Sequence, residues 1–263
     1  MLGIATISYY RLRDLMVCLR SVHSVVTVPF KMVVWDNTER NTSIRDFVKA
    51  AYPEVLYLSD GYNRGCSVGR NRSYAALRSL YGSGLNYFLY LDQDVQLLPG
   101  SINDMMSVSK FRPDWGAVSW PQANMSNIGP TIEGLVSDIA GMCALYRPEA
   151  LDAVGHRSKN GIWDERFLFY RFDSLFAQRM VHEGYYTYLV MKYLVASRSY
   201  MHQSGGVIHH HAHTGVQLNT KCSAVKKQSE DLFQRIQREE GWRVWDVARQ
   251  GKPAPHYKKL RGL

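Results

Sequence analysis

The sequence lacks three features that would assign it to a special class: long apolar runs, paired cysteines and low-complexity segments. No run of about eighteen apolar residues occurs in its 263 positions, so we expect no transmembrane helix. The apolar opening, residues 1–8, is short and has no charged leader, so we do not expect a signal peptide. With 46% hydrophobic and 21% charged residues, the chain has the composition of a folded globular protein.

The four cysteines lie far apart and show no Cys-x-x-Cys spacing. This argues against a zinc site or a redox pair, and isolated thiols are typical of a cytoplasmic protein. We expect them to behave as small buried hydrophobic side chains. They are Cys18, Cys66, Cys143 and Cys222.

The net charge of +9 is concentrated in the last part of the sequence. Residues 221–263 contain eleven Lys or Arg and five Asp or Glu, which gives this stretch +6 of the total. Aromatic residues such as Phe233 and Trp242 are interleaved with the basic ones. Such a segment suits an acidic partner, either a lipid-linked glycan at an anionic membrane surface or DNA. The alternative is that the aromatic residues pack the segment onto the rest of the protein and the basic residues face water.

Strand and helix patterns alternate along the first half of the chain, which indicates a mainly parallel sheet with helices on both faces. The second half is less regular and carries a break at 155–160. Strands are expected at 2–7, 31–35, 55–58, 86–91, 115–120, 135–146 and 185–190. Helices are expected at 11–26, at 43–52 with Ser43 as its cap, at 67–81, at 173–183 and from Ser223 to about Glu240.

Polar residues follow each of the first four predicted strands. Ligands of open parallel sheets bind beyond the carboxyl ends of the strands. Four polar clusters at one edge therefore indicate a nucleotide-sized site, although turn chemistry could explain any one of them. The clusters are Ser8-Tyr9, Asp36-Asn37, residues 60–64 and residues 92–94.

Asp92-Gln93-Asp94 comes directly after an apolar strand. Two carboxylates one residue apart suit a hard divalent cation, Mg²⁺ or Mn²⁺. Such an ion could bridge to a diphosphate and neutralise its charge as a leaving group. The histidines between 202 and 213 are a second metal-ligand hypothesis, with a surface or capping role as the alternative.

Residues 63–71 join a predicted strand to a predicted helix. Gly65 and Gly69 permit close approach of the backbone, and the N-terminus of the following helix favours anions. Arg64 and Arg70 are candidate phosphate ligands. The alternative is a glycine-containing loop with solvated arginines, because the dinucleotide fingerprint is absent.

Three carboxylates flank the aromatic run at 167–170: Asp164, Glu165 and Asp173. Burial beside aromatic rings raises the pKa of a carboxyl group, which suits a general base near neutral pH. Asp173 could instead cap the helix that follows it. Both interpretations stay open.

Taken together, these motifs resemble glycosyltransferase family 2, whose members are inverting enzymes with the GT-A fold. The resemblance covers about residues 2–206. Residues 4–9 and 33–37 resemble the first two strands of the family, which contact the nucleobase. Asn63-x-Gly65 with Gly69-Arg70-Asn71 resembles its N-x-G…AR-N element, with Gly69 in place of the usual Ala. Residues 91–94 resemble its DxD motif, in a form associated with rhamnosyltransferase-like members.

The second half resembles the acceptor-side block of the family, which usually reads Phe-Asp-Glu, then Glu-Asp-x-Asp, then Arg and Gly-Tyr. Asp173 keeps the place of the catalytic base, whereas Phe172 and Leu175 replace two of the usual acids. His202-Gln-Ser-Gly205 resembles a later element that can supply a metal ligand. The corresponding residues here are 141–146, Val154-Gly155, Trp163-Asp164-Glu165, Phe172-Asp173, Leu175, Arg179 and Gly184-Tyr185.

The resemblance implies a GT-A nucleotide-diphospho-sugar transferase fold, a Rossmann-like α/β fold with a mainly parallel mixed sheet and helices on both faces. The implied domains are a catalytic domain at 1–220, with a nucleotide-sugar half at 1–100 and an acceptor half at 101–220, and a basic helical extension at 221–263. The implied activity is a metal-dependent, inverting transfer of a hexosyl or deoxyhexosyl group from a nucleoside diphosphate sugar, with a UDP- or dTDP-sugar favoured. The acceptor hydroxyl would belong to surface polysaccharide or glycan assembly, in the cytoplasm or at the inner membrane surface.

By the same resemblance, Asp173 is the catalytic base, and Asp94, Asp92 and His202 hold Mg²⁺ or Mn²⁺. The implied acceptor side consists of Trp163, Asp164, Glu165 and His211. The implied nucleotide-sugar ligands are Ser8, Tyr9, Arg11, Asp36, Asn63, Arg64, Arg70, Asp92, Gln93 and Asp94.

Three alternatives stay open. A nucleotidyltransferase on a similar sheet typically carries an early glycine-rich loop followed by Arg and Lys, which residues 1–20 lack. A nucleotide-sugar-binding module without catalysis is consistent with the acids lost at Phe172 and Leu175. A phage-type DNA glycosyltransferase acting on a hydroxymethylated base is consistent with a short, basic chain that has no predicted membrane segment.

Overall fold

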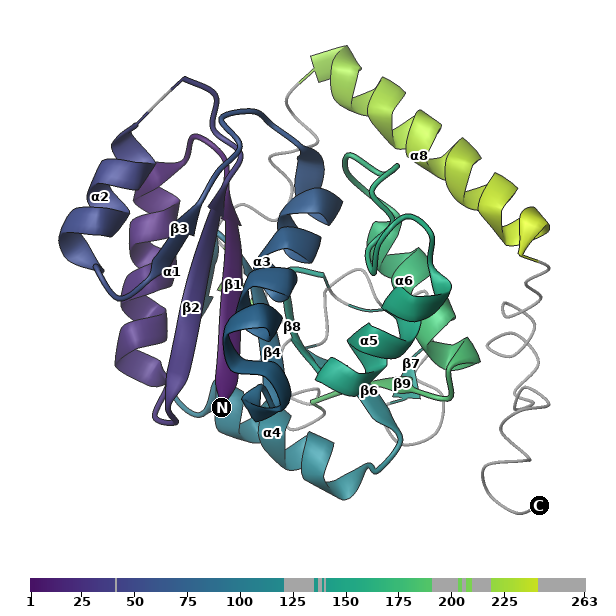
Figure 1. Cartoon of the computed structure of the whole chain (residues 1–263), viewed down its shortest axis with the longest axis horizontal. Coiled ribbons are helices and arrows are strands. Elements are labelled where there is room, and N and C mark those ends of the chain that lie inside the picture. The colour runs from purple at the N-terminus through teal and green to yellow at the C-terminus, as the bar shows by residue number, and fades with distance from the viewer. Residues whose placement is uncertain are drawn as a thin grey trace.

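The computed structural model describes residues 1–40, 42–120, 139, 141–190 and 219–240, and the backbone of short strands at 135–136, 203–204 and 207–209. Side chains of the last helix are described from residue 224 onward. Strands lie in the middle of the molecule and helices cover them on both sides (Figure 1). No helix in these ranges has the length and apolar character needed to cross a membrane.

Eight strands of the described ranges form one mixed sheet in the order β3-β2-β1-β4-β8-β6-β9-β7. Neighbours from β3 to β4 are parallel, as are β6 and β9, whereas β8 runs antiparallel to β4 and β6, and β7 antiparallel to β9. The predicted mainly parallel mixed sheet is confirmed. Its strands are β1 (Leu2–Ser8), β2 (Phe30–Asp36), β3 (Leu56–Leu58), β4 (Tyr87–Asp92), β6 (Trp115–Ser119), β7 (Leu135–Val136), β8 (Cys143–Tyr146) and β9 (Tyr186–Leu189).

A smaller antiparallel sheet lies beside the first and joins β5 to the later part of the chain, in the order β10-β11-β5. Its strands are β5 (Val95–Leu97), β10 (Gln203–Ser204) and β11 (Val207–His209). The helices are α1 (Leu12–Val25), α2 (Ser43–Ala51), α3 (Gly65–Tyr81), the 3₁₀ turn η1 (Gly82–Gly84), α4 (Ser101–Phe111), α5 (Pro148–Arg157), α6 (Phe172–His182) and α8 (Asn219–Glu239).

The central strands are apolar on both faces because each face is covered by helices. Successive residues of a strand point to opposite faces, so Ile4 belongs to the same core as residues of α1 and α2, while Ala5 belongs to the same core as residues of α3. The same alternation separates Leu89 from Phe88 in β4. One apolar core therefore joins α1, α2 and α4, and a second joins α3, α5, α6 and α8.

The C-terminal helix α8 belongs to the second core. Phe233 and Ile236 are almost fully buried against it. The interpretation that aromatic residues pack the C-terminal segment onto the rest of the protein is therefore confirmed for Phe233. Residues 241–263, which include Trp242, lie outside the described residues.

Three local predictions were wrong. Ser43 is the first residue of α2 and Thr42 is its N-cap, so Ser43 does not cap that helix. The predicted break at 155–160 begins too early, because α5 continues through Gly155. A Cβ atom at 155 would lie 3.0 Å from Ile162 Cγ1, so the missing side chain makes room for Ile162.

The predicted strand at 135–146 is two strands, β7 and β8, with Gly141 and Met142 between them.

Candidate active site

The carboxyl ends of β1 and β4 lie side by side at the point where the winding of the sheet reverses. The chain builds β2 and β3 on one side of β1 and returns on the other side as β4, the arrangement at which open α/β sheets bind ligands. Gln93 joins the two strand ends here. Its Oε1 accepts hydrogen bonds from Ser8 Oγ (2.8 Å) and the Tyr9 N–H (3.0 Å), and its Nε2 donates to Tyr9 O (3.2 Å). The residue between the two carboxylates is thereby fixed to β1.

The end of β2 is held by buried polar contacts. Asp36 is fully buried, and its carboxylate accepts from Tyr57 Oη (2.7 Å) and the Thr38 N–H (2.8 Å). Burial and the neighbouring Asp36 charge raise the pKa of Tyr57 well above its ordinary value, so the phenol stays a donor. Asn37 accepts from the Arg64 N–H (3.2 Å) and therefore ties this strand end to the start of α3.

In the turn before α3, the backbone closely approaches a neighbouring segment, as the glycines predicted. The Gly65 N–H donates to Asn63 Oδ1 (3.0 Å), and Gly65 has a φ of 84°, a conformation that favours glycine. A Cβ atom at Gly65 would lie 2.7 Å from Leu168 O. At Gly69 it would lie 2.8 Å from Trp35 Cδ1, so this glycine brings the helix against the sheet.

Arg70 extends from α3 into the protein and ends on Asp173 of α6. Its side chain is 2% exposed, its Nη1 donates to Asp173 Oδ1, and its Nη2 donates to Gly141 O (2.7 Å). Burial alone would lower the pKa of Arg70, but the Asp173 carboxylate raises it well above its ordinary value. The sequence predicted a phosphate contact for Arg70, whereas its guanidinium here is directed to a carboxylate instead of the surface.

Tyr90 connects this ion pair to the end of β4. The Arg70 guanidinium lies 3.6 Å from the centroid of the Tyr90 ring, and Tyr90 Oη donates to Asp92 Oδ1 (3.0 Å). The Asp92 N–H donates to Met142 O (2.7 Å), beside the Gly141 carbonyl that Arg70 contacts. Asp92 and Asp173 are therefore linked through two buried side chains.

Gly141 is the residue that leaves room for Asp173. A Cβ atom at this position would collide with Asp173 Oδ2. The Asp173 side chain is 21% exposed, so it is accessible from solvent while Arg70 is not. Asp173 lies in the first turn of α6, and Arg171 is the N-cap, so the capping alternative for Asp173 is wrong.

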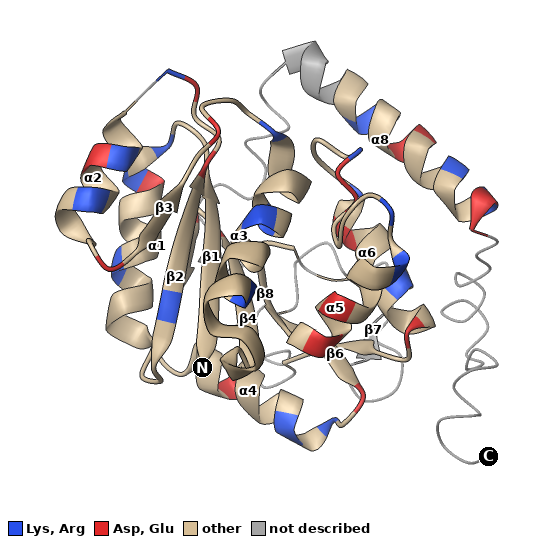
Figure 2. Ribbon diagram, viewed as in Figure 1, with Lys and Arg blue, Asp and Glu red and all other residues tan. Residues whose placement is uncertain are grey.

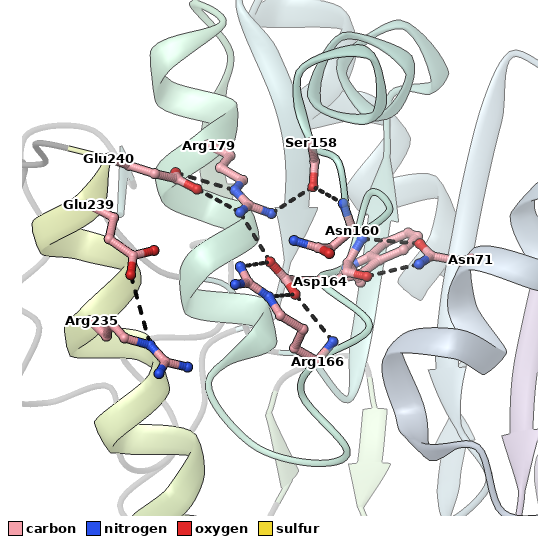
Figure 3. A network of polar contacts seen from close by, with 10 residues as sticks. Asn71, Ser158, Asn160, Asp164, Arg166, Arg179, Arg235, Glu239 and Glu240 are labelled. Atoms are coloured by element: carbon pink, nitrogen blue, oxygen red, sulfur yellow. Dashed lines mark hydrogen bonds and ion pairs between the residues drawn. The ribbon is translucent and has the colours of Figure 1, made fainter.

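Asn71 and Asp164 hold the predicted acceptor-side block. Asn71 accepts from the Trp163 N–H (3.1 Å) and donates to Trp163 O (2.8 Å) and Glu165 Oε1 (2.9 Å). Figure 3 shows Asp164 between two arginines: it accepts from Arg166 Nη2 (2.8 Å) and Arg179 Nη2 (3.1 Å). Burial raises the pKa of Asp164, but these arginines outweigh it and lower the pKa below its ordinary value.

The remaining predicted residues divide by location. Arg11 is half-buried and pairs with Asp14 (3.5 Å), and Arg64 is exposed and pairs with Asp60 (3.4 Å). Trp163 and Asp164 are buried in the second core and its polar network, so their acceptor-side role stays a prediction. The side chains of His202, His211 and the rest of the histidine run lie outside the described residues, as does Cys222. Cys18 and Cys143 are buried, as predicted, and Cys66 is partly buried.

The donor set at the end of β4 fits a hard divalent cation. Asp92 and Asp94 are both partly exposed, and Mg²⁺ is commonly held by one or two carboxylates together with substrate phosphates and water. Burial raises the pKa of the nearby Cys18 thiol to about 12, and the charges of Asp94 and Asp92 add to this shift. The two carboxylates therefore make this edge of the sheet negative. No group of three or more His, Cys, Asp or Glu side chains suited to a metal occurs within the described ranges.

Sequence reasoning missed Tyr90 as a site residue, and it included Gly141 only as the first residue of the stretch that resembles the acceptor-side block. Tyr90 belongs to an aromatic-rich strand, where an apolar core role is the simplest interpretation. Gly141 lies in a segment that was predicted as strand. The available signal was the pair Gly141-Met142, because a glycine within a strand pattern often marks close approach of another group.

No protein-family model matches the sequence, and a search of curated proteins gives no significant match. Solved structures do match in fold. The mannosyltransferase PcManGT from Pyrobaculum calidifontis, in complex with GDP-Man and Mn²⁺, is 17% identical with a TM-score of 0.54, over 72% of this chain and 54% of that chain. TarS 1–349 from S. aureus, in complex with UDP, is 12% identical with a TM-score of 0.52, over 72% of this chain and 57% of that chain.

This chain thus spans little more than half the length of either structure. At these identities the likeness concerns the fold. It agrees with the fold expected from the sequence motifs, including the parallel β3-β2-β1-β4 unit and the antiparallel β8. The chain therefore has the GT-A fold of nucleotide-sugar glycosyltransferases.

Proposed function

We propose that this protein is an inverting glycosyltransferase, which moves a sugar from a nucleoside diphosphate sugar to an acceptor hydroxyl. The observation that carries the proposal is the link between the two halves of the GT-A fold: the Arg70–Asp173 ion pair, joined through Tyr90 to Asp92. The contacts thereby connect a carboxylate suited to receive a proton with a carboxylate pair suited to a divalent cation, which would bind the diphosphate.

In this proposal Asp173 is the general base. It accepts the proton of the acceptor hydroxyl while that oxygen attacks the anomeric carbon, and the bond from this carbon to the diphosphate oxygen breaks. A single displacement inverts the anomeric configuration. Arg70 stabilises the ionised form of Asp173, which is the form that can take a proton, and also fixes its direction through the second contact to Gly141 O.

On the donor side, Asp94 and Asp92 would hold Mg²⁺ or Mn²⁺, with His202 as a further candidate ligand. When bound, the ion supplies charge stabilisation for the diphosphate leaving group. The presence of Mn²⁺ in the PcManGT structure supports this proposal. Ser8, Tyr9, Asp36 and Asn63 border the same edge of the sheet and are the proposed surroundings of the nucleoside. Arg11 and Arg64 are proposed as further ligands of the nucleotide sugar.

The charges of the C-terminal segment bear on the choice of acceptor. Basic and acidic residues are equal in number over residues 224–240, which cover most of α8 and the residue after it, and both signs occur along the helix (Figure 2). The basic residues are Lys226, Lys227, Arg235 and Arg238, and the acidic residues are Glu230, Asp231, Glu239 and Glu240. The basic excess of the C-terminal segment is therefore carried mainly by residues 241–263. We propose a lipid-linked glycan as acceptor, with DNA that carries a hydroxymethylated base as the second candidate.

A donor screen tests the proposed function. UDP-, dTDP- and GDP-sugars would be incubated with the protein, with and without Mn²⁺ or Mg²⁺, and release of the nucleoside diphosphate measured. Metal-stimulated release from one donor is expected, and a product of inverted configuration in the presence of acceptor. Nucleotide binding without release by any donor would support the inactive binding module instead. Hydroxymethylated duplex DNA and vesicles carrying a lipid-linked glycan, compared as acceptors, would separate the two acceptor classes.

A further inference from the structure

The helix α8 contacts the segment that leads into α6, two residues before Asp173. Ser229 Oγ donates to Phe169 O (2.7 Å), and Arg171 Nε donates to Glu230 Oε2 (2.6 Å). The Arg171 guanidinium also lies 5.3 Å from the centroid of the Phe233 ring. In Figure 1, α8 runs past α6 along its outer side. The two hydrogen bonds join residues 59 and 60 positions apart in the chain.

The segment that α8 contacts has an unusual backbone. Tyr170 and Arg171 have φ angles of 69° and 67°, so two consecutive residues with side chains adopt the left-handed conformation. This conformation is unfavourable for residues with a Cβ atom and persists where the surrounding structure enforces it. Arg171 is the N-cap of α6, and its carbonyl accepts from the Leu175 N–H (3.0 Å). The turn therefore sets the start of the helix that carries Asp173.

The other side of the same segment is fixed to α3. The Cys66 N–H donates to Leu168 O (3.0 Å), and Gly65 approaches that carbonyl so closely that a side chain would not fit. The segment 168–171 is thus held between the start of α3 and the middle of α8. Since Arg70 of α3 binds Asp173, a shift of the turn would separate the two partners of this ion pair.

We propose that Ser229 and Glu230 are positioning residues, through which α8 holds the turn at Tyr170 and Arg171 and so directs the Asp173 carboxylate. This inference rests on the proposed function, because it takes Asp173 as the base. Neither residue needs to touch a substrate. In this proposal the C-terminal helix contributes to the reaction. The packing of Phe233 and Ile236 alone would contribute only to stability.

The test compares the double variant Glu230→Gln with Ser229→Ala to a substitution of the neighbouring acid, Asp231→Asn. Glu230→Gln removes the partner of Arg171, and the matched control Asp231→Asn removes the same charge from an exposed position of the same helix. We expect kcat to fall about 10-fold or more in Glu230→Gln combined with Ser229→Ala, because small displacements of a catalytic group are costly. The KM for the donor should stay unchanged, and Asp231→Asn should behave as the wild type.

Arg171→Gly supplies a rescue experiment. Glycine adopts the left-handed conformation without strain, so with glycine at 171 the turn depends less on α8. Adding Arg171→Gly to Glu230→Gln with Ser229→Ala should therefore restore part of kcat. Backbone hydrogen exchange over residues 166–176 gives a second readout that needs no turnover. It should be faster in Glu230→Gln with Ser229→Ala than in Asp231→Asn.

The outcomes separate this inference from the proposed function. Unchanged kcat and unchanged exchange in Glu230→Gln with Ser229→Ala would overturn the inference. So would a fall in kcat that glycine does not rescue, or a parallel rise in the donor KM, since either would indicate a general loss of structure. If the wild type turns over no donor, the proposed function fails, and the exchange data alone still decide whether α8 holds the turn.

Discussion

The guanidinium of Arg70 and the carboxylate of Asp173 form an ion pair across the two halves of the chain, 103 residues apart in sequence. Arg70 is buried and Asp173 is partly exposed, so the pair has one end in the core and the other at the surface. A buried arginine needs a compensating charge, because desolvation of an unpaired cation is costly. Asp173 therefore supports the fold as well as the proposed reaction, and experiments on it have to measure both.

Replacement of Asp173 by Asn should abolish most of the turnover. The amide cannot take the proton from the hydroxyl of the acceptor, so we expect kcat to fall by about 100-fold or more. The KM for the donor should stay unchanged. Because Arg70 loses its partner, the free energy of unfolding should also fall by about 3 kcal/mol. Steady-state kinetics and urea unfolding would measure the two effects. The matched control is Asp152→Asn. It removes the charge that pairs with Arg78 (Nη2 to Oδ2, 2.7 Å), which lies on α3 as Arg70 does, and it should leave kcat unchanged. Wild-type turnover by the Asp173→Asn variant would show that another residue is the general base.

Replacement of Gly141 by Ala should reduce both activity and stability. The new Cβ atom collides with the tip of the Asp173 side chain, which then has to turn away from Arg70 and from its proposed position. We expect kcat to fall about 10-fold or more, by the same argument on small displacements. Gly84→Ala is the control, since no atom lies within 4 Å of the added Cβ and its φ is not positive. Equal kcat values for the two variants would contradict the assigned role of Gly141.

Replacement of Asp94 by Ala should remove the dependence of activity on Mn²⁺ or Mg²⁺ together with most of the activity itself. The diphosphate would lose its counter-charge, and a loss of about 100-fold in kcat/KM is expected. Calorimetric titration with Mn²⁺ and a nucleoside diphosphate would show weaker binding than in the wild type. Glu149→Ala, which removes an exposed carboxylate of α5, should change neither measurement. Full wild-type activity in excess EDTA would refute the metal requirement.

Replacement of Asp164 by Asn should destabilise the protein at neutral pH and much less in acid. Asp164 is buried between Arg166 and Arg179, and its pKa is lowered, so it stabilises the folded state above the ordinary Asp pKa of about 4. This contribution is lost as the pH falls through the lowered pKa of the folded state. We expect a difference in the free energy of unfolding of about 3 kcal/mol at pH 7, which shrinks below about pH 4. Denaturant unfolding at several pH values would test this, and a pH-independent difference would disprove the charge assignment.

Most of the sheet could be predicted because its strands are apolar runs and its helices have regular apolar spacing. β1, β2 and β4 end within about one residue of the expected positions. α5 was missed because Gly155 was interpreted as a break, although a glycine costs a helix interior only about 1 kcal/mol. α4 has a mixed surface of Ser, Asp and Met with a weak apolar pattern, and it was not predicted either.

The contacts within the site could be predicted only in part. The sequence indicates that Asp173 and Arg70 are special, but it does not say that they meet, because pairing across 103 residues depends on the packing of α3 against α6. Arg70 was accordingly assigned to phosphate on its chemistry alone. The roles of Tyr90 and Gly141 also follow from proximity, since each acts by touching a residue that is distant in the chain.

The Gln93 side chain has a consequence for how this sequence can vary. Its amide accepts from Ser8 and Tyr9 and donates to Tyr9, so position 93 needs an acceptor and a donor on one side chain of this length. Glutamate could accept but not donate, and lysine could donate but not accept. The middle residue of an Asp-x-Asp motif is often treated as a spacer, but here Gln93 is hydrogen-bonded to Ser8 and depends on it. In relatives of this chain, a change at position 93 should be accompanied by a change at position 8, and libraries that randomise the motif should vary both positions together.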